Sequence, residues 1–161
     1  MKIGFVIDAM IKYYAGDVRR INHFLKVYGF AKAIGEMEGL DGETQNILEI
    51  AALTHDIGIK NSEMKYNSAA GNYQELEGPP EARLLLTVLN YDSELIDRVC
   101  WLIAHHHTYH AIEGIDYQIL IEADFLVNAH EDNLSAAAIH NVRTRLFRTA
   151  AGIKLLDEMY F

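Results

Sequence analysis

The residues best suited to chemistry are His55 and Asp56, which follow an apolar segment at 51–53 and come shortly before Gly58. An unpaired carboxylate in apolar surroundings either costs several kcal/mol of folding free energy or shifts its pKa until it is neutral. A divalent cation removes that cost, because imidazole nitrogen and carboxylate oxygen both coordinate such ions at about 2.0–2.2 Å. The adjacent pair therefore predicts a metal site whose other ligands come from elsewhere in the chain.

More histidines and one more aspartate fall on apolar helix faces. Asp124 lies four residues after Leu120 and three before Val127, so helical spacing places it inside an apolar stripe. Any one such residue could be a hydrogen-bonded core residue or belong to a solvated helix end. Several histidines with two carboxylates, however, match the mixed nitrogen and oxygen ligands of a divalent cation. The histidines that share apolar faces in this way are His23, His55, His106 and His107.

The elements that must position these residues are expected to be almost entirely helical. Asp17, Asp41, Asp92 and Ser135 are suited to cap helix N-termini. The stretch 61–78 lacks clear periodicity and is expected to be a long irregular loop, with Pro79–Pro80 opening the next helix. The chain therefore predicts an all-α fold of about eight helices, over 7–14, 18–37, 44–56, 81–89, 94–107, 117–129, 136–147 and 150–159.

Composition limits the classes of function. Half of the 161 residues are hydrophobic and 23% are charged, which is typical of one globular domain with a real core. The net charge of −9 argues against non-specific nucleic-acid binding. We expect a cytoplasmic protein without a membrane partner, because Cys100 is the single cysteine and no apolar run reaches the roughly 18 residues of a membrane span.

Four short segments, in order, resemble a known family. They are Arg-Ile-Asn-His at 20–23, Leu-Thr-His-Asp-Ile-Gly at 53–58, Ile-Ala-His-His-His at 103–107 and Ala-Asp-Phe-Leu at 123–126. This H…HD…D order resembles the HD-domain superfamily of metal-dependent phosphohydrolases. The resemblance covers about residues 18–130. It implies a single HD domain over 1–161, folded as a compact helical bundle. The helices at 135–161 carry no obvious chemistry, so we expect them to serve packing or dimerisation.

The resemblance also implies a ligand set. His23, His55, Asp56 and Asp124 would hold one divalent metal, which could be Mn, Fe, Mg, Ni or Zn. In binuclear members a second metal takes further histidines, and His106 and His107 match two of them. A third usually comes from an H-P-x-x-G stretch, where this chain has Glu77 in the nearest place. Many members have a lysine three residues after the HD aspartate, whereas here Lys60 follows one position later.

The activity implied is hydrolysis of a phosphomonoester or phosphodiester, expected to be a nucleotide, by a metal-activated water. Asp56 would accept a proton, and His106 or His107 would assist the leaving group. Lys60, Lys65 and Arg83 are cations expected near the phosphate, and Tyr66 and Tyr73 could stack on a base. A cyclic-di-GMP phosphodiesterase is disfavoured, because Thr108–Tyr109–His110–Ala111 lacks the GYP element. Two alternatives stay open, a di-iron HD-fold oxygenase and a non-catalytic HD-like binding module.

Overall fold

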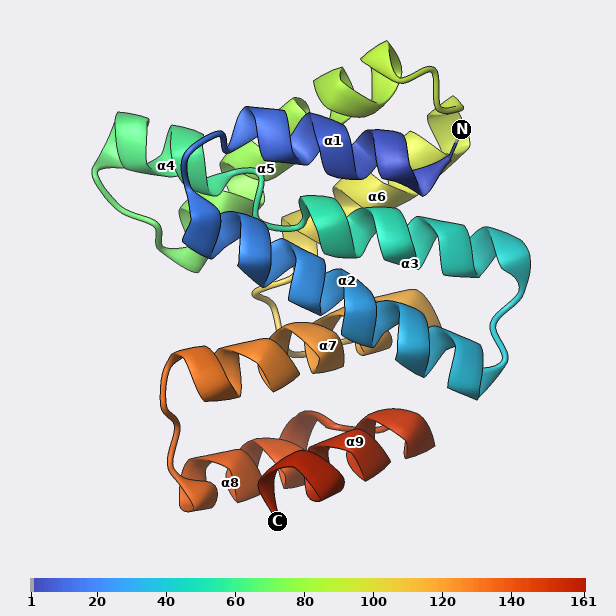
Figure 1. The fold of residues 1–161 in the computed structure, drawn as a ribbon, viewed down its shortest axis with the longest axis vertical. Helices are drawn as coiled ribbons and strands as arrows, with labels where there is room; N and C mark the ends of the chain where they lie inside the picture. Colours follow the sequence, from blue (N-terminus) through green and yellow to red (C-terminus); the bar gives the residue numbers. More distant parts are fainter. Residues whose placement is uncertain (1) are drawn as a thin grey trace.

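The computed structural model describes residues 2–161, which form nine helices (Figure 1). No strand occurs among these residues, so the predicted all-α class is confirmed. None of the helices is both long and apolar enough to cross a membrane. The helices are α1 (Ile3–Tyr13), α2 (Val18–Glu38), α3 (Gly42–Thr54), α4 (Ile59–Tyr66), α5 (Gly71–Val88), α6 (Ser93–His105), α7 (Ile115–Glu131), α8 (Ala136–Leu146) and α9 (Ala150–Tyr160).

The prediction of a long irregular loop at 61–78 is wrong, because α4 and the first half of α5 occupy most of this stretch. The buried side of α5 repeats at helical spacing, but it begins with Gln74, Glu77 and Gly78 and turns apolar only at Ala82 and Leu86. A polar buried stripe escapes a search for apolar periodicity. Pro79 and Pro80 do not open this helix; they lie inside it and remove two of its N–H donors.

The predicted N-terminal caps are all present. The side chains of Asp17, Asp41, Asp92 and Ser135 each accept a hydrogen bond from a backbone N–H in the first turn of the following helix. These bonds satisfy donors that a helix cannot pair internally. Local sequence therefore determines where four of the helices begin.

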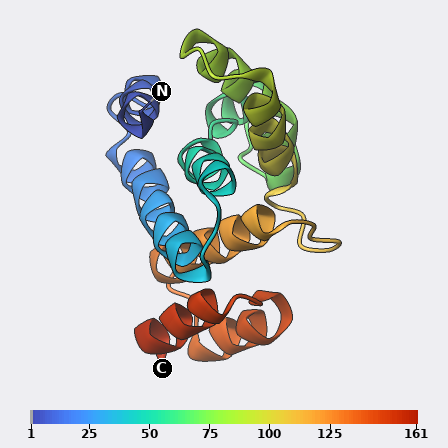
Figure 2. The ribbon, with the colours of Figure 1, turned by 90° about the vertical axis from the view of Figure 1, so that its right-hand side faces the viewer.

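Helix α3 is the centre of the bundle (Figure 2). It packs against α2 on one side and α6 on the other, α5 covers α6, and α7 crosses the ends of this layer and contacts both α2 and α3. The core cluster draws on all of these helices and includes Phe24, Leu48, Ile103 and Leu120. The arrangement brings the C-terminal ends of α3 and α6 to the middle of α7 and the first turns of α2.

Helices α8 and α9 form a layer beneath α7 (Figure 1), where a buried carboxylate anchors α9. Glu122 of α7 accepts hydrogen bonds from the backbone N–H groups of Arg148 and Thr149, at 2.7 and 3.0 Å, and from the Thr149 hydroxyl. A second carboxylate, Glu38 of α2, accepts from the N–H of Ala151 at 2.7 Å. Negative charge is favourable at a helix N-terminus, so both residues stabilise the docking of α9.

Candidate metal centre

The central motif lies in a tight turn between α3 and α4. His55 is fully buried, and its Nδ1–H donates to the carbonyl of Ala52 at 2.7 Å, which leaves the lone pair of Nε2 free. The backbone oxygen of Asp56 accepts a hydrogen bond from the Tyr14 hydroxyl at 2.7 Å. The first bond orients the His55 ring, and the second fixes the backbone of Asp56. Together they hold the two side chains in place.

Gly58 is needed here for close packing, and not as the C-terminal cap of α3 that its position suggests. A Cβ at residue 58 would lie 2.6 Å from the carbonyl oxygen of Gln74 and 2.6 Å from the nitrogen of Gly78. Such distances are far inside van der Waals contact. The glycine therefore lets the turn after Asp56 rest directly on the backbone of α5.

Four side chains from three separate regions converge at this turn. His23 Nε2 lies 3.2 Å from Asp56 Oδ2 and 3.2 Å from Asp124 Oδ1. His55 Nε2 lies 3.4 Å from each of the same two oxygens and 3.3 Å from His23 Nε2. The structure thus brings together residues separated by about a hundred positions, from α2, the α3–α4 turn and α7.

These separations suit a shared cation. Ligands about 2.0–2.1 Å from one ion in a tetrahedral arrangement are about 3.3–3.4 Å apart. His23, His55 and Asp56 have ligand atoms close enough to share an ion, and Asp124 Oδ1 adds an oxygen beside both imidazoles. Asp124 Oδ1 is buried and has no hydrogen-bond partner among the described residues, although two imidazole nitrogens are close to it. An orphaned buried carboxylate oxygen is costly. The donor set and the orphaned oxygen therefore both fit a divalent metal held by His23, His55, Asp56 and Asp124.

The electrostatics of the cluster also favour a positive charge at its centre. Burial opposes protonation of His23, but Asp124 and Asp56 outweigh burial and raise the pKa of His23 to about 11. Burial alone would raise the pKa of Asp124; the neighbouring histidines His55 and His23 outweigh it and lower that pKa. The carboxylates thus stay ionised and attract positive charge, which is either a proton or a metal.

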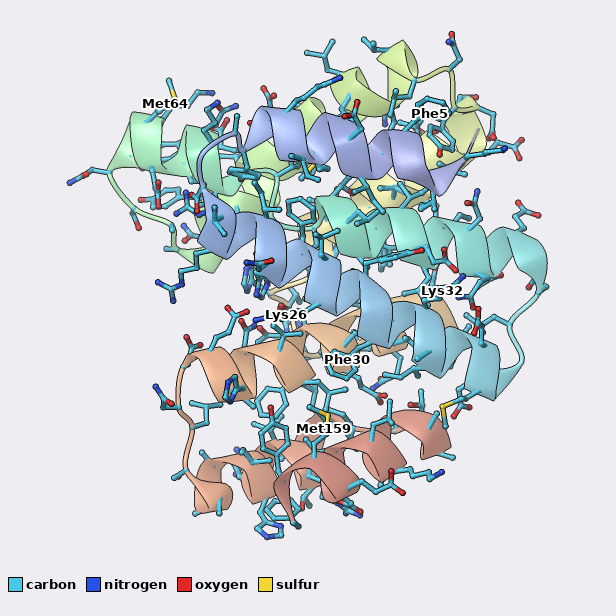
Figure 3. All side chains as sticks on the ribbon, in the orientation of Figure 1. Phe5, Lys26, Phe30, Lys32, Met64 and Met159 are labelled. Carbon is cyan, nitrogen blue, oxygen red and sulfur yellow. The ribbon has the colours of Figure 1, made fainter. Side chains whose placement is uncertain are left out.

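Glu131 supports the cluster from behind. Its Oε2 lies 3.2 Å from His23 Nδ1, so the imidazole donates to the carboxylate through Nδ1 and presents Nε2 to the cluster. A carboxylate behind a metal-ligating histidine fixes its tautomer and raises its basicity. Lys26 lies between α2 and α7 in Figure 3, and its ammonium is 3.5 Å from Glu131 Oε1. One oxygen of Glu131 therefore contacts His23 and the other faces the ammonium of Lys26, which together hold the carboxylate in place.

The other oxygen of Asp56 faces a second group of ligands. Its Oδ1 lies 3.6 Å from His106 Nε2, which is buried and has no hydrogen-bond partner among residues 2–161. The His106 Nδ1–H donates to the carbonyl of Ile103 at 2.7 Å, so Nε2 has a free lone pair. Asp56, His106 and His107 have ligand atoms close enough to share an ion. Asp56 thus stands between two groups that could each hold a metal.

The remaining sequence candidates lie away from this cluster and are committed to other partners. Glu77 pairs with Lys65 at 2.8 Å and accepts from the Tyr66 hydroxyl at 3.0 Å. Lys60 donates to the carbonyl of Tyr13 at 3.3 Å and lies over its ring. Arg83 pairs with Asp97 at 2.7 Å, and Tyr66 stacks on Tyr73.

A cleft of about 620 Å³ opens onto the cluster of His23, Asp56 and Asp124. Arg20, in its wall, is paired with Glu63 and Asp17. Arg19 is exposed and makes no ion pair within the described chain, so it is a free cation at the cleft. The lining residues are Asp17, Arg19, Arg20, His23, Asp56, Ile59, Ala69, Gln74, His107, Asp124, Asn128, Glu131 and Asp132.

Three residues of this site were missed by sequence reasoning. Glu131 follows Asp124 by seven positions and so shares its helix face, a signal that the spacing rule could have found. Arg19 stands next to the first motif but has no distinguishing pattern. Gln74, whose Oε1 lies 2.8 Å from His107 Nε2, falls in the segment expected to be irregular, and nothing local marks it.

Comparisons with known proteins agree with the fold. A solved structure described as a predicted HD superfamily hydrolase from an uncultured Thermotogales bacterium matches with a TM-score of 0.69 and 24% identity, over 96% of this chain and 83% of the other. No curated protein matches significantly. The family model for the HD domain matches residues 20–142, a span that includes all four proposed ligands of the first metal. The chain therefore belongs to the HD-domain family, whose helical fold and motif order it shares.

Proposed function

We propose that the protein is a divalent-metal-dependent phosphohydrolase that cleaves a phosphomonoester or phosphodiester, with a nucleotide as the favoured substrate. The observation that carries this proposal is the convergence of His23 and His55 on Asp56 and Asp124, with imidazole–carboxylate separations of 3.2–3.4 Å and an orphaned carboxylate oxygen, at the base of an open cleft. A bound divalent cation would supply a water of lowered pKa and neutralise charge on the phosphoryl oxygens.

The charge of the cleft supports dependence on a metal. Five carboxylates line it, from Asp17, Asp56, Asp124, Glu131 and Asp132. An anionic substrate would be repelled by such a lining unless a cation offset it. Arg19 has no ion-pair partner among residues 2–161 and can hold a phosphoryl oxygen by a charge-assisted hydrogen bond. We therefore assign to Arg19 the phosphate contact that the sequence had suggested for Lys60, Lys65 or Arg83.

His107, one of the two histidines beside Asp56, is suited to bind a metal in the neutral state. Burial first, and the nearby His106 second, lower the pKa of His107 to about 4. The imidazole is then uncharged at neutral pH, as a metal ligand must be. This favours a ligand role for His107 over that of a proton donor, while Asp56 remains the group placed to accept a proton from an attacking water.

The test is hydrolysis of a panel of phosphomonoesters and phosphodiesters by metal-loaded, chelated and reloaded protein. We expect activity that is lost on chelation and restored by one added divalent metal. Asp56→Asn should lower kcat/KM at least a hundredfold, while Asp97→Asn on the surface should leave it within twofold. Hydrolysis that persists without metal, or in Asp56→Asn, would refute the proposal.

The same preparation tests the alternatives. A coloured protein with two irons per chain and no phosphoester turnover would favour an oxygenase, for which His106 and His107 offer further ligands. Protein that binds no metal would favour a binding module. We also propose a cytoplasmic location and a homodimeric state; the single cysteine, Cys100, is buried and unpaired, as suits a reducing compartment.

A further inference from the structure

A second cavity, of about 480 Å³, lies between α7 and α8 and adjoins the metal cleft. Asp124 and Asn128 line both, so the two spaces meet at a proposed metal ligand. The second cavity is different in character: its walls are largely apolar, formed by Ile121, Phe125 and Leu146. Apart from Asp124 and Phe125, its lining residues lie outside the motif segments, and several come from α8, a helix to which the sequence assigns no chemistry.

The walls of this cavity are held in place. Ile121 is 2% exposed. The Phe125 ring packs edge-on against Phe147, with the ring centres 5.8 Å apart and the planes at 76°. Glu122, beside Ile121 on α7, anchors the start of α9 and so fixes the segment that follows α8. A largely preformed apolar cavity with few polar groups is typical of a small-molecule site.

The polar groups at the cavity can form hydrogen bonds with the edge of a planar ring in a ligand. Asn128 and Asn141 contribute carboxamides, each able to donate and accept hydrogen bonds. Arg145, from α8, is exposed and makes no ion pair with any of residues 2–161. Its guanidinium has no side-chain partner there and is free for an acceptor on a ligand. Tyr109 closes the side toward the cluster, with its hydroxyl 3.5 Å from His107 Nδ1.

We propose that the α7–α8 cavity binds the leaving group of the substrate, and that this group is a planar ring system with hydrogen-bonding atoms at its edge. The phosphoryl group would then lie at the cluster by Asp124, with the ring between Phe125 and Val142 and its edge facing Asn141 and Arg145. This inference rests on the proposed phosphohydrolase function. It assigns substrate selection to α8, and to Arg145 and Asn141 in particular.

The experiment compares kcat/KM for a nucleoside 5′-monophosphate with kcat/KM for glycerol 2-phosphate, a phosphoester without a ring. Arg145→Ala should lower the ratio of the two values about tenfold, and Val142→Trp, which fills the cavity, by more. Val88→Trp is the matched control, because Val88 is 71% exposed on α5, far along the chain from the site. The control should leave both values within twofold, and circular dichroism should show that each variant is folded.

A ratio unchanged in both Arg145→Ala and Val142→Trp would overturn the assignment. If the wild-type protein hydrolyses neither these two esters nor any other member of the phosphoester panel, the proposed function fails, but the cavity is still tested by NMR with the phosphate-free nucleoside. The amide signals of Asn141, Val142 and Arg145 should then shift in the wild type and not in Val142→Trp. The absence of those shifts in the wild type, at millimolar nucleoside, would also overturn the assignment.

Discussion

At the scale of single residues, the site depends on tautomers set by the backbone and by Glu131. The Nδ1 atoms of His55 and His106 are each taken up by a carbonyl three residues earlier, and that of His23 by Glu131. All three imidazoles therefore turn Nε2 towards the cluster, and His23 gives up its Nε2 proton when a metal binds. Preorganised ligands lose little freedom when a metal binds, so we expect a site formed before the metal arrives.

Glu131→Gln should weaken metal binding about 10–100-fold, the range found for groups that orient a metal-ligating histidine. The amide keeps the shape of the side chain but loses the charge that favours a basic Nε2 on His23. The measurement is the Kd for Mn²⁺ or Zn²⁺ by competition with a chelating dye. Glu158→Gln, on the exposed face of α9, is the control and should not change the Kd; equal affinities in all three proteins would count against a role for Glu131.

The stability of metal-free protein should fall as pH rises from about 6.5. The ordinary pKa of histidine is about 6.5, and Asp124 and Asp56 raise the pKa of His23 to about 11 against the effect of burial. The bound proton therefore stabilises the folded state fully below about pH 6.5, and this contribution is lost as pH rises towards 11. The slope would be at most about 1.4 kcal/mol per pH unit.

Urea unfolding between pH 6.5 and 9, with and without metal, measures this dependence. In metal-loaded protein the cation replaces the proton, so the slope should largely vanish. Metal-free His23→Gln should show a smaller slope, and not a zero one, because against the effect of burial Asp56 and Asp124 raise the pKa of His55 as well. A metal-free wild-type protein whose unfolding free energy is constant over this range would show that His23 holds no such proton.

At the scale of elements, the backbone of the turn after Asp56 packs directly against the backbone of helix α5. Gly58→Ala should destabilise the fold by about 1–3 kcal/mol, the usual effect of overpacking, because its Cβ would meet the backbone of Gln74 and Gly78 at 2.6 Å. Metal affinity should fall with it, since the displaced turn carries His55 and Asp56. Thermal unfolding and a metal titration check both effects.

Gly29→Ala is the matched control for this prediction. Gly29 lies inside α2, and a Cβ there would meet nothing within 4 Å. Alanine is the better helix former, so this variant should be about 0.5–1 kcal/mol more stable. If Gly58→Ala were as stable as wild type, the close approach of the turn to α5 would not be a constraint on the fold.

At this scale, the local sequence predicts some of the helices and not others. Caps and apolar stripes are local signals, and they correctly predict the all-α class and four helix starts, at Asp17, Asp41, Asp92 and Ser135. The buried stripe of α5 begins with Gln74 and Glu77, whose partners come from other segments, and so only the second half of this helix is predicted, at 81–89. The motifs predict which residues are ligands, but the cleft itself depends on how α2, α4 and α7 meet, which no local pattern encodes.

At the scale of the whole molecule, one cluster joins α2, the α3–α4 turn and α7. A metal that binds only the folded state stabilises it according to its affinity, by about 2.7 kcal/mol at a concentration of 100 Kd. For a domain of this size each kcal/mol shifts Tm by about 2–4 °C. Removal of the metal should therefore lower Tm by roughly 5–11 °C, as differential scanning calorimetry would measure, and reloading should restore it; an unchanged Tm would mean that the cluster does not hold a metal under those conditions.

The central claim is that His23, His55, Asp56 and Asp124 together hold a divalent cation. Its most direct test is the metal content of the wild-type protein and of Asp124→Ala, both purified without chelator and measured by inductively coupled plasma mass spectrometry. We predict at least one equivalent of a divalent metal in the wild type and much less than one in the variant, with the helical circular dichroism of both unchanged. A folded Asp124→Ala protein that keeps its full equivalent of metal would contradict the account.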